Sequence, residues 1–222
     1  GTGLEGDYAN CFFMVDFRGG ASNSGIRLIR VQPKGAFWSV ERSEQPIWNI
    51  LATDAEFGPD GALWVCDWVN GWMGEGKGRI YRFFDTAAQQ QTIVREVQSL
   101  LAAGFSDLSE ARLGELLQHL DRRIRNEAQW ELAHRGLIAP FAELIATPAA
   151  GTLPRLHAVW GLGQAARLTP ALRETIAPSI ELALADTDLD VRAAAAGVVG
   201  DLKLDSSASD LVGLIGDSEP RV

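Results

Sequence analysis

Two aspartates at equivalent positions of two similar segments are the strongest candidates for binding residues in this chain. Asp16 lies near the end of the apolar run 11–17, and Asp67 near the end of the run 62–68. Each is followed by an aromatic residue and a Gly-rich loop. Such a carboxylate can bind a cofactor, a metal or a sugar, or it can accept hydrogen bonds from loop amides and hold the turn. Because the position repeats, we favour the structural role.

The loop after Asp67 contains two indoles beside polar groups. Trp68 and Trp72 flank Asn70 in the run 68–72. Paired tryptophans beside Asp and Asn suit the face of a sugar, and a loop packed over a sheet edge would use them equally well. Both interpretations stay open. Arg18, in another Gly-rich loop, can contact an anion or lie in solvent.

The other titratable residues form no catalytic or metal-binding set. The three histidines, at 119, 134 and 157, have no partner at ligand spacing, so a surface or interhelical role is expected. Asp186, Asp188 and Asp190 alternate as in a calcium loop, but the Gly and the closing Glu are missing. We expect them to form turns and helix starts. No signature of a hydrolase, a zinc protease or a nucleotide site is present.

Composition and charge exclude several functions. A net charge of −9 argues against nucleic-acid binding, which needs clustered Lys and Arg. No apolar run approaches the ~20 residues that span a bilayer. The chain opens without a signal peptide and closes without a final element, so we expect it to be a piece of a longer protein. Cys11 and Cys66 can pair in an exported protein, but two buried free thiols are the simpler expectation.

The first 85 residues repeat with a period near 50, which predicts two blades of a β-propeller. The runs 11–17 and 62–68 match, with Asp16 and Asp67 separated by 51 residues. A second strand follows each loop, and there Arg30 matches Arg82 at a separation of 52. Short apolar strands with Gly-rich turns at this period are typical of blades. Pro59 and Gly61 predict a tight hairpin between strands near 55–58 and 62–67.

After residue 85 the chain is rich in Ala, Leu, Glu and Arg, which predicts a helical solenoid. Ile124, Leu156, Val191 and Val222 each follow a turn and recur every 31 to 35 residues. Preceding helices should supply partners, and such pairs must stack to bury their faces. Those partner helices are marked by apolar residues: Leu113, Leu116, Leu117, Leu120; Phe141, Leu144, Ile145; Ile176, Ile180, Leu184. Small residues should let the helices approach closely: Ala158, Gly161, Ala193, Ala194, Gly197.

The sequence therefore predicts a mixed β-then-α chain, a partial β-propeller followed by an α-solenoid of HEAT-like repeats. We expect propeller strands in residues 1–85, a linker and first helix in 86–105, and the solenoid in 106–222. The polar stretch 85–91 has the composition of the linker.

Residues 12–83 resemble the closing blades of the glucose/sorbosone dehydrogenase-like propeller in the large membrane-bound dehydrogenases of planctomycetes and their relatives. The likeness is carried by the runs 15–19, 25–27, 32–35, 51–54, 57–63, 67–72 and 76–82. Proteins of that family continue from the propeller into HEAT repeats, and often into a c-type haem domain. The order of segments in this chain, propeller strands followed by HEAT-like helix pairs, is similar to theirs.

The resemblance implies an exported or periplasmic bacterial protein whose parent binds pyrroloquinoline quinone and calcium. The related soluble enzymes hold the quinone with an arginine pair before the Pro-Asp-Gly hairpin, where this chain has the run 51–53, Leu-Ala-Thr. We therefore assign no cofactor-binding role of those enzymes to a residue of this chain. Arg18, Asp54 and Asp67 are the polar positions expected to face the channel, and Trp68 and Trp72 are the candidates for substrate contact.

Two hypotheses follow. The chain is a fragment of a propeller-type sugar or alcohol dehydrogenase, itself not catalytic, whose HEAT segment is a scaffold that docks other protein domains. Alternatively, it belongs to a non-catalytic interaction protein with a degenerate propeller. A histidine base and calcium ligands in neighbouring blades would favour the enzyme.

Overall fold

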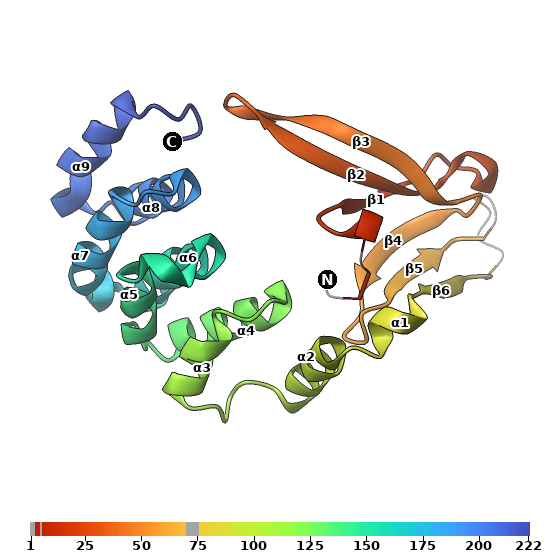
Figure 1. Ribbon diagram of the computed structural model, residues 1–222, viewed down its shortest axis with the longest axis horizontal. Coiled ribbons are helices and arrows are strands. Elements are labelled where there is room, and N and C mark those ends of the chain that lie inside the picture. Colours follow the sequence, from red (N-terminus) through yellow and green to blue (C-terminus); the bar gives the residue numbers. More distant parts are fainter. Residues whose placement is uncertain (1–2, 5, 70–75) are drawn as a thin grey trace. The chain divides into compact units, whose positions relative to one another are not determined.

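The computed structural model describes residues 3–4, 6–69 and 76–222 and divides the chain into two compact units. Residues 1–102 contain the strands and the first two helices, and residues 103–222 contain the remaining helices. The predicted order of β structure followed by helices is confirmed (Figure 1).

The described part of the N-terminal unit contains two three-stranded antiparallel sheets. Sheet A has the order β1-β2-β3 and sheet B the order β4-β5-β6, so each is built from consecutive strands. The strands are β1 (Phe12–Asp16), β2 (Gly25–Lys34), β3 (Phe37–Trp48), β4 (Ala52–Phe57), β5 (Leu63–Asp67) and β6 (Arg79–Phe83).

The predicted hairpin at Pro59 and Gly61 is confirmed. It joins β4 to β5, and the amide of Gly58 donates to the carbonyl of Ala62 at 2.9 Å. Gly61 has a φ of +75°, a value that a residue with a side chain rarely adopts. The hairpin fixes the register in which Phe57 lies opposite Leu63.

The sheets enclose one apolar core. Ile26, Ala52, Leu63 and Val65 are fully buried in it, and the ring of Phe13 contacts that of Phe57 edge to face at 5.3 Å between centroids. Removing these side chains from water is the main force that holds the sheets together.

Sheet A turns only one of its faces to this core. Along β1, Phe13 and Val15 pack against the core, whereas Phe12 is 64% exposed and Met14 is 44% exposed. We call the face of sheet A that carries Phe12, Met14 and Asp16 its outer face. Alternate side chains of a strand point to opposite faces, so this division follows from the period of two.

The residues of sheet B that face the core are the sequence equivalents of the residues of sheet A that face away from it. Leu63 and Val65 are buried, yet by the sequence repeat they match Phe12 and Met14, which point away from the core. Trp64, the match of an inward residue of sheet A, is 40% exposed. Equivalent side chains thus face the same direction, and the two sheets stack head to tail.

The expected match of Arg30 with Arg82 is wrong. Phe13 pairs with Leu28 in sheet A, and its equivalent Trp64 pairs with Arg82 in sheet B, so Arg82 corresponds to Leu28. The connection between β5 and β6 is three residues longer than that between β1 and β2, so the second strands match at a separation of 54 residues, two more than the expected 52. A shift of two preserves the face.

Two helices follow the sheets, in the stretch 86–105 that was expected to contain a linker and a first helix. They are α1 (Thr86–Gln89) and α2 (Thr92–Ala103), the last residue of which begins the second unit. Asp85 caps α1, because its carboxylate accepts hydrogen bonds from the amides of Ala87 and Ala88. Val94 and Val97 are the buried residues of α2.

The C-terminal unit contains successive helix pairs. Its α-helices are α3 (Glu110–Leu116), α4 (Arg122–His134), α5 (Ala139–Ile145), α6 (Thr152–Leu168), α7 (Arg173–Leu184), α8 (Leu189–Leu202) and α9 (Ala208–Gly213). Helices α4, α6 and α8 pack in one row, and each also packs against the helix that precedes it (Figure 1).

The expected core residues of the helical unit are buried, with two exceptions. Ile124 and Val191 are inaccessible to solvent and Leu156 is 8% exposed, each in the first half of its helix. Leu120 is 80% exposed, because it lies in the turn after α3 and not on the helix itself. Val222 is half-buried and follows a turn, outside any helix.

The small residues of these helices differ in what they allow. A Cβ on Gly161 would lie 2.4 Å from two ring atoms of Phe141, so the absence of a side chain is required there. A Cβ on Gly197 would meet nothing within 4 Å. The expectation that Gly197 brings helices together is therefore wrong, since it lies on an open side of α8.

Candidate functional site

Asp16 lies in an ion-pair network at one end of sheet A. Arg18 donates from Nε and Nη2 to its two carboxylate oxygens at 2.8 and 2.9 Å, and Arg27 donates from Nε at 2.7 Å. Hydrogen bonds from Arg18 and then Arg27 lower the pKa of Asp16. The guanidinium of Arg27 also lies over the ring of Trp48, 5.5 Å from its centroid. Asp16 is thus held by side chains and not by loop amides.

Asp67 lies at the end of β5 and organises backbone. Its carboxylate is buried, and Oδ1 accepts hydrogen bonds from the amides of Leu51 at 3.0 Å and Val69 at 2.9 Å. The amide of Trp68 in turn donates to the carbonyl of Leu51 at 2.9 Å. These contacts favour the structural interpretation of Asp67, since one oxygen connects the start of β4 with the turn after β5.

The other candidates do not converge with these carboxylates. Asp54 pairs with the exposed Cys66, on the face of sheet B opposite to Asp67, and its Oδ1 accepts a hydrogen bond from the amide of Ala55. Trp68 is 45% exposed. Trp72 lies outside the described residues.

The polar candidates Arg18, Asp54 and Asp67 therefore do not fit a quinone site. The guanidinium of Arg18 already binds both oxygens of Asp16, and Asp54 and Asp67 lie on opposite faces of one sheet. A planar tricarboxylate would need cations that are free to bind it. These side chains therefore support no chemical step through a quinone.

The cysteines also lie differently from the expectation. Both thiols are free, Cys11 is half-buried and Cys66 is exposed, so two buried thiols are not observed. Cys66 points away from the core because it alternates with the buried Val65 and Asp67 along β5. In the described part of the chain, no group of three His, Cys, Asp or Glu side chains is placed to hold a metal ion.

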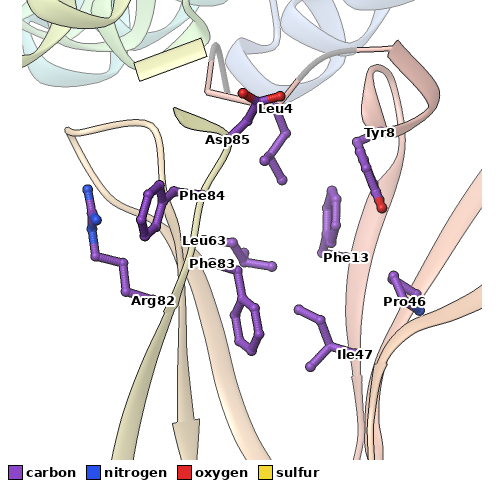
Figure 2. A pocket seen from close by; sticks show the side chains of 10 residues that line it. All are labelled: Leu4, Tyr8, Phe13, Pro46, Ile47, Leu63, Arg82, Phe83, Phe84 and Asp85. Atoms are coloured by element: carbon purple, nitrogen blue, oxygen red, sulfur yellow. The ribbon is translucent and has the colours of Figure 1, made fainter. Parts of the chain in front are cut away.

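A pocket of about 580 Å³ opens between the two sheets. Figure 2 shows Phe13 and Ile47 of sheet A on one side and Phe83 and Leu63 of sheet B on the other. Its lining residues are Leu4, Tyr8, Phe13, Pro46, Ile47, Leu63, Arg82, Phe83, Phe84 and Asp85.

The two charged residues of this pocket are held by other groups. Arg82 donates to Asp60 at 2.8 Å and lies over the ring of Phe84, 4.4 Å from its centroid. Burial raises the pKa of Asp60, but hydrogen bonds from Arg82 and Trp64 outweigh that and lower it overall. Asp85 caps α1. The pocket therefore suits an apolar group, and its charged side chains are already engaged.

In the helical unit, the aspartates of the turns begin helices and bind arginines. Asp188 caps α8, and Asp186 accepts the amide of Asp188 at 2.7 Å, so the expected turn and helix-start roles are confirmed. Arg155 reaches the carboxylate of Asp186 at 2.9 Å. Arg192 does the same with Asp217 at 2.7 Å. Arg155 of α6 thus contacts the turn between α7 and α8, and Arg192 of α8 contacts the segment that follows α9.

Among the described residues, His157 is the one histidine that the structure buries, and sequence reasoning could not single it out. Its Nδ1 lies 2.8 Å from Oε1 of Gln129, and its ring contacts Trp160 edge to face. Gln129 donates from Nε2 to Gln164, so its Oε1 accepts and Nδ1 of His157 carries the proton. Burial, with the charges of Arg125 and Arg122, lowers its pKa to about 4.

We predict that His157 makes the helical unit acid-sensitive. In the unfolded chain His157 binds a proton below its ordinary pKa of 6.5, whereas in the folded chain it stays neutral down to about pH 4. The free energy of unfolding therefore decreases as the pH falls from 6.5 to about 4. After allowance for solvent screening, the loss is about 2 kcal/mol. Urea unfolding at pH 7 and pH 4.5 should show this decrease in the free energy of unfolding, and H157Q should remove the part of it that comes from His157.

The control is H134Q, at an exposed histidine, which should keep the pH dependence of the wild type. Equal pH dependence of H157Q and the wild type would contradict the prediction.

No described helix is both long enough and apolar enough to cross a membrane. Comparison of the chain with protein-family models, with curated proteins and with solved structures finds no match.

Proposed function

We propose that this chain is the structural, non-catalytic part of an exported propeller-type sugar or alcohol dehydrogenase. Sheets A and B are two consecutive blades, and the helix pairs are HEAT-like repeats that act as a scaffold for other protein domains. The quinone and the calcium of the parent protein bind to other blades. The sequence likeness through residue 83 supports the dehydrogenase class.

The observation that carries the proposal is the head-to-tail stack of the two sheets. Two sheets packed back to back would bury equivalent faces and be complete. A head-to-tail pair leaves one face of each kind uncovered, and only further sheets or closure into a ring can cover both. Phe12 and Met14 are exposed on one such face, and Trp64 and Ile80 on the other.

The strand order supports the same proposal. Within the matched strands, β5 pairs with β4 on one side and β6 on the other, whereas among the described residues its equivalent β1 pairs with β2 alone. β1 therefore has an open edge where its neighbour in a blade would lie, and propellers protect such edges by closure.

The non-catalytic part of the proposal follows from the polar candidates. Asp16 and Arg18 bind each other, and Asp67 binds backbone amides. The charged groups expected to face a channel are thus engaged in contacts within sheets A and B.

The test compares the 222-residue chain with the polypeptide of its full reading frame. Each is incubated with pyrroloquinoline quinone and calcium and assayed for dye reduction with aldoses and alcohols. We expect activity in the full polypeptide only, and quinone binding to the chain weaker than micromolar. Micromolar or tighter binding to the chain would contradict its non-catalytic role.

A full polypeptide that is inactive with every substrate after reconstitution would overturn the dehydrogenase assignment and favour the interaction scaffold. In the active polypeptide, M14D should cost stability, because a neighbouring sheet would cover Met14. I215D is the matched control, since Ile215 is 86% exposed and lies in the helical unit.

A further inference from the structure

Helices α3 and α5 form a groove of about 530 Å³ on the surface of the helical unit. The groove continues along the segment that follows α5. Its lining residues are Glu110, Ala111, Gly114, Glu115, Gln118, Pro140, Glu143, Leu144, Thr147, Ala149 and Ala150.

Small and aliphatic residues form the floor of this groove. Gly114 lies in the middle of α3, and a Cβ there would approach the ring of Pro140 to 3.2 Å. Ala149 and Ala150 extend the apolar surface beyond α5, and Leu144 is 7% exposed at its base. The absence of a side chain at Gly114 thus lets Pro140 of α5 approach α3 closely, and small or aliphatic side chains line the groove.

Carboxylates form the rim. Glu110, Glu115 and Glu143 line the groove and are exposed, and none of the described residues of its lining is Lys or Arg. Glu115 binds Arg112 at 2.8 Å. Within the described part of the chain, neither Glu110 nor Glu143 has an ion-pair partner. The groove therefore combines an apolar floor with uncompensated negative charge.

We infer that this groove binds a basic segment of a partner protein, with Ala or Leu in the floor and Lys or Arg on both sides. The inference deepens the proposed scaffold role of the helical unit and rests on it. An apolar floor rewards small aliphatic side chains, and the acidic rim selects cationic neighbours and excludes acidic segments. The groove's charge is unsuited to nucleic acid or to an anionic membrane.

The probe is a fluorescein-labelled peptide of sequence RKALAARK, measured by fluorescence anisotropy at low salt. We expect saturable one-to-one binding that E110K/E143K weakens at least tenfold, because two attractions become repulsions. The matched control is E174K/D210K, which changes the charge equally at exposed positions outside the groove and should alter affinity less than twofold. A111L, at an exposed residue of the lining, should weaken binding with the charge unchanged.

Three results would overturn the inference: no saturable binding, equal weakening by the two charge-reversed pairs, or full affinity in A111L. Equal weakening would mean that the peptide reads only the overall charge. Far-ultraviolet circular dichroism checks that each variant is folded. If the full polypeptide reduces dye while the groove fails these tests, the proposed function stands and only this binding surface is lost.

Discussion

Substituting Val191 with Asp should strongly destabilise the helical unit. Val191 is inaccessible to solvent at the start of α8, a helix that packs against α6 and α7. An unpaired carboxylate there would cost about 3–5 kcal/mol. In thermal unfolding followed by circular dichroism, Tm should fall by ~10 °C or more.

The matched control is V212D, because Val212 is 64% exposed on α9. It should leave Tm nearly unchanged, since surface substitutions usually stay within about 0.5 kcal/mol. If V191D melted like the wild type, Val191 would not be a buried residue and the assigned repeat register would be wrong.

Two glycine-to-alanine substitutions should change stability in opposite directions. In G161A, the new Cβ would lie 2.4 Å from Cε1 and Cζ of Phe141, which must move. We expect a loss of about 2–3 kcal/mol from overpacking. In G197A nothing lies within 4 Å of the new Cβ, so the better helix propensity of Ala should add up to about 1 kcal/mol.

A double-mutant cycle assigns the loss in G161A to one contact. F141L removes the ring atoms that the methyl group meets, so G161A should cost clearly less in the F141L background. Urea unfolding of the four variants gives the coupling free energy. Additive losses would mean that G161A acts elsewhere than on Phe141.

Helix positions and their buried residues could be predicted because the helical period is local. Ile124, Leu156 and Val191 head helices at similar intervals, and all three are buried as the pattern indicates. The turn aspartates were equally readable, since an Asp before a helix caps it through bonds to amides close in sequence.

The direction in which the sheets stack could not be read from the repeat. Matching Asp16 with Asp67 aligns the strands, but only the packed core reveals that Leu63 faces it while its equivalent Phe12 does not. The exposure of Cys66 follows from that choice. A strand pattern defines two faces, and which one becomes buried depends on the partner.

The candidate site divides in the same way. The sequence by itself determined the β-then-α order, the tight hairpin before β5, the helix pairs and the capping aspartates, because each depends on residues a few positions apart. Only the tertiary structure decided that Arg27 of β2 binds the carboxylate of Asp16, that Asp67 accepts a hydrogen bond from the amide of Leu51, and that the ring of Phe141 fills the space at Gly161. Those contacts join residues from different elements, and their energies depend on distances that no local pattern encodes.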